Sequence, residues 1–219
     1  NGTAECTQCA AGKYSAAIGA TKVATCVDCG AGKYLVSQGG VEEADCVLCG
    51  AGKYSTFSAA ASREACVACG PGKFSTALGA SSDSTCEGCP VGTFSGSLGA
   101  TMCEWCTVGK YGFDLAGQSC TQCEPGKYSG SIGAISESTC LQCGPGKFST
   151  ARGAASNETC VDCGRGKYTD TRGNGAESQC QSCPQGKFST EFGATTVLSC
   201  INCAAGTFSM AVGRQSEDD

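Results

Sequence analysis

The chain has no histidine, five prolines, one tryptophan and few large aliphatic residues among its 219 positions. Without histidine, neither a Ser–His nor a Cys–His pair can activate a nucleophile. Ile, Leu, Val and Phe together number 30, which falls below the roughly 20% expected of a chain that folds around an apolar core. No apolar run reaches the roughly 18 residues that a membrane-spanning helix needs, and no calcium-loop or phosphate-binding motif occurs. The sequence therefore predicts no enzyme.

Cysteine is abundant and regularly spaced. The 22 cysteines form eleven Cys-x-x-Cys pairs, and ten steps separate successive pairs, eight of 20 residues and two of 17. A fixed period of about 20 residues indicates a tandem array of small units. In such an array each unit is expected to contact mainly its neighbours. The pairs begin at Cys6, Cys26, Cys46, Cys66, Cys86, Cys103, Cys120, Cys140, Cys160, Cys180 and Cys200.

Each unit repeats more than its cysteines. A glycine lies three residues after every second cysteine, an aromatic residue follows two positions later, and a lysine separates them in nine units. A glycine at every such position suggests positive φ or close backbone approach. The Gly-Lys-aromatic segment, a Gly-Ala turn and the return to cysteine predict one short β-hairpin per unit. We expect a small disulfide-rich, mostly irregular or all-β fold, an elongated rod or solenoid of one-disulfide hairpins.

The array is expected to run continuously over 1–219 as one domain, with short irregular units near 89–120. Because the pattern calls for a further cysteine just after Asp219, we expect these residues to be a segment of a longer array. Trp105, the only tryptophan, lies between the two short units. It is interpreted either as filling a local irregularity or as a lateral contact.

Disulfides are expected to stabilise a chain that has so little apolar surface. Joining the second cysteine of one pair to the first of the next closes loops worth roughly 3 kcal/mol each. First-to-first and second-to-second pairing is the alternative, and a four-cysteine zinc site has a similar spacing. An odd number of identical pairs disfavours both, and no metal is expected. The favoured bonds are Cys9–Cys26, Cys29–Cys46, Cys49–Cys66, Cys69–Cys86, Cys89–Cys103, Cys106–Cys120, Cys123–Cys140, Cys143–Cys160, Cys163–Cys180 and Cys183–Cys200, with partners of Cys6 and Cys203 outside the window.

Covalent glycans are the only non-protein groups expected, and no cofactor is predicted. Asn1 and Asn157 begin Asn-x-Thr sequons for N-glycosylation. A hydroxyl residue follows the aromatic in most units, and it either stabilises a turn or bears an O-linked sugar. With a net charge of −5 and dispersed lysines, nucleic acid is not an expected partner. The O-glycan candidates are Ser15, Ser55, Ser75, Ser129, Ser149, Thr169 and Ser189.

The motif Cys-x-x-Cys-x-x-Gly-Lys-Tyr/Phe-Ser, followed by Gly-Ala and the next Cys-x-x-Cys, resembles the ephrin-receptor-type cysteine-rich repeat. It is also similar to the first half-module of tumour-necrosis-factor-receptor domains, as in Cys183-Pro184-Gln185-Gly186-Lys187-Phe188. The resemblance implies extracellular, elongated ectodomains with disulfides of the Cys9–Cys26 type. Long uniform arrays resemble those of protist and algal surface proteins, including the mastigoneme type.

Two functions follow as expectations. The first is a secreted structural glycoprotein that self-associates into filaments by end-to-end stacking of its repeats. The second is the stalk or ligand-binding ectodomain of a cell-surface receptor or adhesin. Both place the chain outside the cell, where disulfides form and persist, and neither requires a membrane-spanning segment in this chain.

Overall fold

The computed structural model describes residues 5–218. The residues cluster by their contacts into two compact units. Unit 1 comprises 5–104 and Asp114–Ser119, and unit 2 comprises Trp105–Phe113 and the residues from Cys120 onward. The division falls in the two short repeats, where the 20-residue period is broken.

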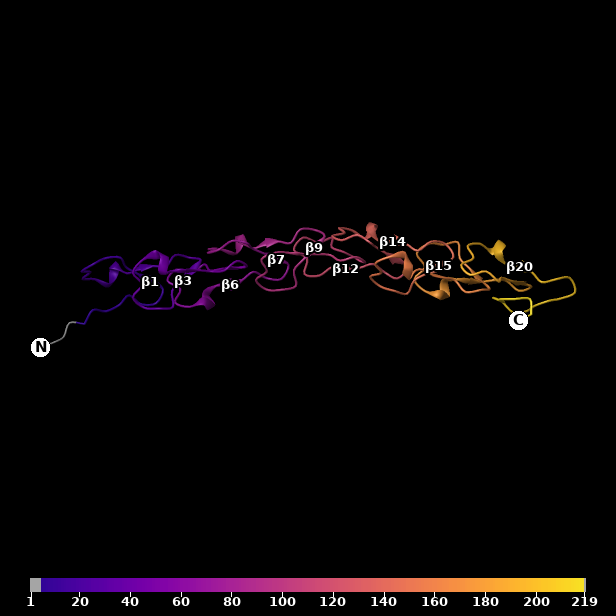
Figure 1. Ribbon diagram of the computed structural model, residues 1–219, viewed down its shortest axis with the longest axis horizontal. Coiled ribbons are helices and arrows are strands. Elements are labelled where there is room, and N and C mark those ends of the chain that lie inside the picture. The colour runs from indigo at the N-terminus through magenta and orange to yellow at the C-terminus, as the bar shows by residue number, and fades with distance from the viewer. Residues whose placement is uncertain (1–4, 219) are drawn as a thin grey trace. The chain divides into compact units, whose positions relative to one another are not determined.

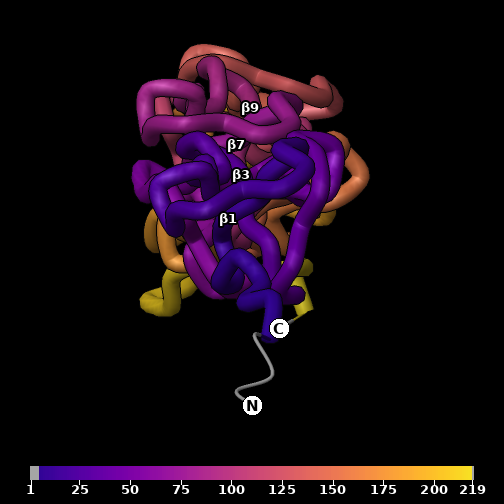
Figure 2. Tube along the Cα trace, turned by 90° about the vertical axis from the view of Figure 1, so that its left-hand side faces the viewer, coloured from indigo at the N-terminus to yellow at the C-terminus, as the bar shows by residue number. Residues whose placement is uncertain are grey.

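Two-residue strands and single turns of 3-10 helix are the elements of both units, and the described residues contain no α-helix. Figure 1 shows successive strands following in chain order along each unit, and Figure 2 shows those of unit 1 end-on. The strands are Lys13–Tyr14 (β1), Val27–Asp28 (β2), Lys33–Tyr34 (β3), Val47–Leu48 (β4), Lys53–Tyr54 (β5), Val67–Ala68 (β6), Lys73–Phe74 (β7), Glu87–Gly88 (β8), Thr93–Phe94 (β9), Glu104–Trp105 (β10), Lys110–Tyr111 (β11), Thr121–Gln122 (β12), Lys127–Tyr128 (β13), Leu141–Gln142 (β14), Lys147–Phe148 (β15), Val161–Asp162 (β16), Lys167–Tyr168 (β17), Gln181–Ser182 (β18), Lys187–Phe188 (β19) and Ile201–Asn202 (β20). The 3-10 turns are Val23–Thr25 (η1), Glu43–Asp45 (η2), Arg63–Ala65 (η3), Asp83–Thr85 (η4), Glu137–Thr139 (η5), Asn157–Thr159 (η6), Glu177–Gln179 (η7) and Val197–Ser199 (η8).

Each repeat folds as a hairpin closed by a disulfide, which confirms the predicted tandem array. In the second repeat, β3 pairs antiparallel with β4, so that Lys33 lies opposite Leu48. The preceding turn requires Gly32, whose φ is 83°, a value that an L side chain adopts only with strain. The short 3-10 turn η2 then leads into Cys46, which is bonded to Cys29.

Main-chain hydrogen bonds join each repeat to the next. The Gly32 N–H donates to the Ser55 carbonyl at 2.8 Å, and the Leu35 N–H donates to the Ala60 carbonyl at 2.9 Å. In the opposite direction the Ala59 N–H donates to the Cys29 carbonyl at 2.8 Å. Equivalent bonds recur within both units, and a parallel bridge accompanies them between most of the repeated aromatic residues and the residue after the next turn. The backbone of one repeat is therefore satisfied by that of its neighbour.

The contacts also reach the repeat after next, beyond the neighbours that were expected to supply most of them. A Cβ built on Gly52 would lie 2.1 Å from the carbonyl oxygen of Gly99, two repeats further along. Gly32 and Gly79 meet in the same way in unit 1, as do Gly146 and Gly193 in unit 2, where the distance is 2.0 Å. A single small hairpin covers so little surface that three successive repeats are needed to bury one turn. Both reasons for the repeated glycine, positive φ and close approach, therefore apply.

The interior consists of cystine, alanine and small hydroxyl side chains in place of large aliphatic ones. The second repeat shows how tightly this interior is filled. Leu35 occupies the position where most other repeats have serine or threonine, and it is buried against Tyr14, Cys29 and Cys46. Gly40 replaces the usual alanine, since a Cβ there would lie 2.7 Å from the Leu35 side chain. The larger and smaller residues compensate for each other in volume, as close packing requires.

Candidate functional site

The disulfides form a regular series of cross-links. Each joins the second cysteine of one pair to the first of the next, with Cα atoms 5.5–5.9 Å apart. Cys6 is exposed and Cys203 half-buried, and neither forms a disulfide among the described residues. Within 5–218 no three metal-ligating side chains come together. The ten bonds are Cys9–Cys26, Cys29–Cys46, Cys49–Cys66, Cys69–Cys86, Cys89–Cys103, Cys106–Cys120, Cys123–Cys140, Cys143–Cys160, Cys163–Cys180 and Cys183–Cys200.

The row of hydroxyl residues after the aromatics lies mostly inside the molecule. Six of the O-glycan candidates are at most 3% exposed, namely Ser55, Ser75, Ser129, Ser149, Thr169 and Ser189. Their oxygens accept the backbone N–H two residues later, as in the bond from Phe57 N to Ser55 Oγ. Burial contradicts the O-glycan interpretation for these six in the folded chain, since a sugar has no room there. They are turn-stabilising hydroxyls. Ser15 is partly exposed, so its modification stays a prediction.

Asn157 is exposed at the start of η6, in the unit 2 hairpin that Cys143–Cys160 closes. The hydroxyl of Thr159, which completes the sequon, donates to the Ser156 carbonyl at 3.0 Å. The amide side chain of Asn157 forms no hydrogen bond to any residue that the structure describes. A glycan on its nitrogen would project into solvent. Asn1, the other sequon, lies outside the described residues.

Trp105 is 63% exposed and rests on a turn of the repeat after next. A Cβ built on Gly133 would lie 2.7 Å from the indole ring. The same position in other repeats is occupied by smaller or more polar side chains, such as Gln122 on Gly153 and Gln142 on Gly173. The tryptophan therefore fits the common packing of this position while presenting most of its ring to solvent. Its role as a lateral contact stays a prediction.

The repeated lysine forms ion pairs with two kinds of partner. Where the 3-10 turn begins with glutamate the lysine reaches that carboxylate, as Lys127 reaches Glu137 at 2.6 Å. In two other hairpins the lysine bonds the aspartate opposite it, as Lys147 bonds Asp162 at 2.7 Å. Hydrogen bonding to the Lys33 ammonium and its charge lower the pKa of Glu43. The pairs are exposed, so each contributes little to stability.

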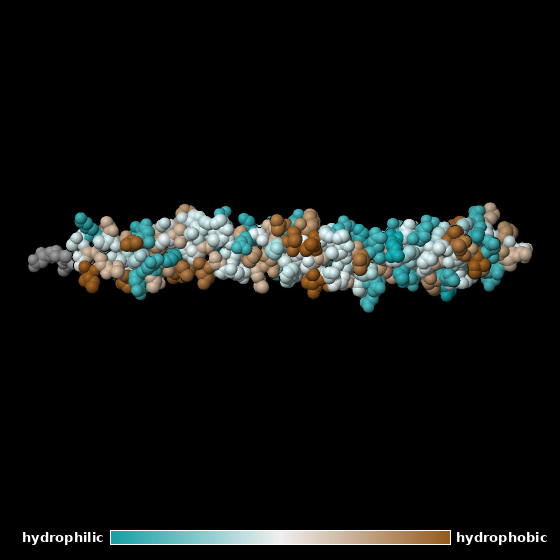
Figure 3. All heavy atoms as spheres, turned by 90° about the horizontal axis from the view of Figure 1, so that it is seen from above, coloured by the Kyte–Doolittle hydropathy of each residue, from teal (hydrophilic) through white to brown (hydrophobic). Residues whose placement is uncertain are grey.

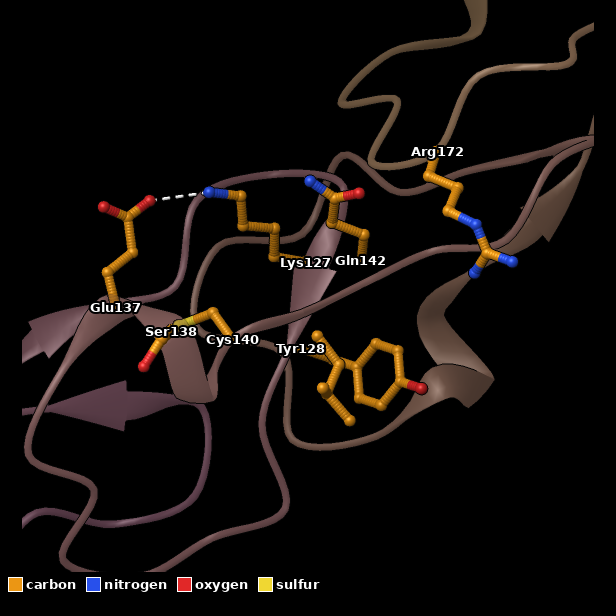
Figure 4. A pocket seen from close by; sticks show the side chains of 8 residues that line it. Lys127, Tyr128, Glu137, Ser138, Cys140, Gln142 and Arg172 are labelled. Carbon is orange, nitrogen blue, oxygen red and sulfur yellow. Dashed lines mark hydrogen bonds and ion pairs between the residues drawn. The ribbon is translucent and has the colours of Figure 1, made fainter.

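A pocket of about 740 Å³ opens in unit 2 between the seventh hairpin, β13–β14, and a turn of the ninth repeat. Its lining includes Lys127, Tyr128, Glu137, Ser138, Gln142 and Arg172. In Figure 4 the Lys127–Glu137 pair lies at one side and Arg172 at the other, with Gln142 and Tyr128 between them. The periodic pattern did not reveal this site, since the deciding residue, Arg172, stands at a position that varies from repeat to repeat.

Large apolar side chains are exposed singly, many of them at the residue before the turn glycine, such as Ile18, Leu78, Ile132 and Phe192. Figure 3 shows them as small separate groups among polar residues. Scattered exposure of this kind needs no special explanation. The Arg165 guanidinium covers the Phe192 ring at 4.9 Å in a cation–π contact.

The hairpins and cross-links define a disulfide-rich tandem repeat protein. A family model described as tyrosine-protein kinase ephrin type A/B receptor-like matches residues 153–200. No curated protein matches the chain. Residues 153–200 are thus similar to cysteine-rich repeats of the ephrin-receptor-like type, and the match spans slightly more than two of the 20-residue periods.

The disulfides and the family match together indicate an extracellular domain. Over the described residues, the structure has no helix of the length and hydrophobicity that crossing a membrane requires. Repeats of this type are non-catalytic, and what they do depends on surfaces added to the fold. The exposed groups described above are therefore the candidates for function.

Proposed function

We propose that the chain is a structural extracellular glycoprotein that builds filaments by end-to-end stacking of its repeats, as mastigoneme-type proteins do. The main support is the uniformity of the junctions between repeats. The bond from Gly32 N to Ser55 O in unit 1 has the same 2.8 Å length as that from Gly146 N to Thr169 O in unit 2. Because these junctions use backbone groups and positions common to the repeats, repeats of one copy can stack on those of another.

Stacking of one copy on the next would be a head-to-tail contact between identical subunits. Identical subunits joined by a heterologous contact form filaments when the rotation between them does not close. Trp105 is proposed as an anchor for lateral association, since exposed tryptophans are frequent energetic centres of interfaces. The proposal includes no catalytic step, and its only non-protein groups are covalent glycans.

Negative-stain microscopy of the oxidised, secreted chain tests this proposal. We expect filaments many times longer than one molecule. In the variant Trp105→Gln we expect single filaments with reduced bundling. Glutamine should keep the local packing, because Gln122 and Gln142 occupy the equivalent position and rest on the turns at Gly153 and Gly173. Monodisperse single molecules at all concentrations would contradict filament building and favour the receptor or adhesin ectodomain.

Asn157 is proposed as the site of N-glycosylation. Expression in glycosylating secretory cells should give a chain in which the peptide containing Asn157 loses the mass of one N-glycan on enzymatic deglycosylation. The variants Asn157→Gln and Thr159→Ala should lack that glycan, because the acceptor needs both the amide and the hydroxyl. Thr159→Ser retains a hydroxyl and is the control that should keep it. A wild-type peptide 153–163 of unmodified mass would show that this sequon is not used.

A further inference from the structure

We infer that the pocket beside Arg172 binds a carboxylate-bearing pyranose, a uronic acid residue. The inference is independent of filament formation. It rests on one unpaired guanidinium placed next to an aromatic ring and an amide, a combination that one hairpin of the array presents.

Main-chain contacts fix the positions of the lining side chains. In the hairpin β13–β14, Lys127 lies opposite Gln142 and Tyr128 lies opposite Leu141. The Gln142 side chain rests on the turn at Gly173, where a Cβ would lie 3.2 Å from it. Arg172 immediately precedes this glycine. The register of one hairpin and the turn of the ninth repeat therefore place the Gln142 side chain against the backbone next to Arg172.

The charge of Arg172 is not neutralised by the protein. Arg172 forms no ion pair or hydrogen bond with any residue between 5 and 218. The lysine that lines the same pocket is already paired, since Lys127 bonds Glu137 at 2.6 Å. The guanidinium is thus the free cation of this pocket, and its planar fork suits the two oxygens of a carboxylate.

The arginine one repeat earlier provides an internal comparison. Arg152 bonds both oxygens of Glu124, at 3.0 and 2.9 Å. Glu124 precedes 152 by 28 residues, and the residue 28 before 172 is Gly144. Both positions lie in the same local sequence, Cys-x-Pro-Gly. Arg172 therefore lacks the carboxylate that neutralises Arg152, and a ligand carboxylate would take its place.

The other lining groups suit a sugar ring. The half-buried Tyr128 supplies an aromatic face, which packs against the apolar face of a pyranose. Gln142 and Ser138 offer amide and hydroxyl groups for the sugar hydroxyls. In the next hairpin Asp162 takes the place of Gln142 and rests on Gly193, with Phe192 in place of Arg172. That hairpin lacks an unpaired arginine at this position, because Lys147 is paired with Asp162 and the nearby Arg165 guanidinium stacks on the Phe192 ring. The proposed site is therefore specific to the seventh hairpin.

Titration with a matched pair of sugars tests the inference. Methyl β-D-glucuronide and methyl β-D-glucoside differ only in a carboxylate replacing a hydroxymethyl group. Binding to the oxidised chain is followed by ligand-observed NMR at low ionic strength, because salt screens exposed charges. We expect the glucuronide to bind about threefold to tenfold more tightly than the glucoside. Acetate, which has the charge without the ring, should bind more weakly than the glucuronide.

Three variants locate the site. Arg172→Ala should abolish the preference for glucuronide, and so should Gly144→Glu, which supplies the missing internal carboxylate and leaves Arg172 in place. A side chain at 144 meets open space, so that variant should fold as the wild type does. Arg152→Ala is the matched control and should keep the preference. The inference would be overturned if the two sugars bound equally tightly or if acetate bound as tightly as the glucuronide. It would also be overturned if Arg152→Ala lost the preference for glucuronide to the same extent as Arg172→Ala.

Discussion

Replacing Gly52 by alanine is expected to open the array locally and cost at least about 2 kcal/mol. Gly52 has a φ of 76°, and an L residue held there stores roughly 1–3 kcal/mol of strain. Its Cβ would also lie 2.1 Å from the carbonyl oxygen of Gly99, and relieving that overlap should cost roughly 1–3 kcal/mol more. The turn two repeats away must therefore move.

Hydrogen exchange at single residues measures this effect. The Gly99 amide donates to the Cys69 carbonyl at 2.8 Å, and its protection factor should fall by at least about 30-fold, which corresponds to about 2 kcal/mol. Gly50→Ala is the control, since a Cβ there meets nothing within 4 Å and its φ is not positive. Unchanged protection of Gly99 in Gly52→Ala would show that repeats two apart do not touch.

Removing one disulfide should be the other large perturbation. The double variant Cys49→Ala with Cys66→Ala releases a loop worth about 3 kcal/mol in the chain-entropy account. The loss falls on a chain whose interior is cystine, alanine and serine, so no large apolar side chain can compensate. Because Cys49 is fully buried, reductant should reach this bond only after local opening, and full reduction should unfold the described repeats.

Limited proteolysis and a non-reducing peptide map measure these effects. The double variant should be cleaved first near residues 49–66, whereas Cys6→Ser, which removes a cysteine outside the ten disulfides, should keep the wild-type pattern. The map should recover each of the ten cross-linked peptides, including that of Cys49 and Cys66. A fully reduced chain that keeps its protease resistance would show that sulfur bridges do not maintain the fold.

Local features of the fold could be predicted from the sequence because they depend on neighbouring residues. Hairpins, turn glycines and the array itself follow from the repeated Gly-Lys-aromatic segment and the cysteine period. The contact between Gly52 and Gly99 could not be predicted, because a period fixes the interval between repeats but not the rotation from one repeat to the next. Sequence also cannot show whether the residue after a two-residue strand faces inward. It therefore leaves two roles for Ser55, a turn-stabilising hydroxyl or a glycan site, and only its burial decides between them.

The candidate functional residues also differ in whether the sequence predicts them or only the structure reveals them. Asn157 was found from its sequon and is exposed. Arg172 was missed, because its significance depends on what is absent at Gly144, and that comparison requires knowing that Arg152 reaches Glu124. A pairing between residues 28 apart crosses from one repeat to the next, and the sequence alone does not reveal it.

The order of the cross-links sets how the chain transmits tension. A pull along the backbone passes from Cys26 across three peptide bonds to Cys29, then across a bridge whose Cα atoms lie 5.7 Å apart to Cys46. Residues 30–45 bear no load. The tensile path is then about 17 Å per repeat, against roughly 70 Å for the same 20 residues fully drawn out. While its bridges are intact the polypeptide behaves as a nearly inextensible tether, and reduction would lengthen it about fourfold.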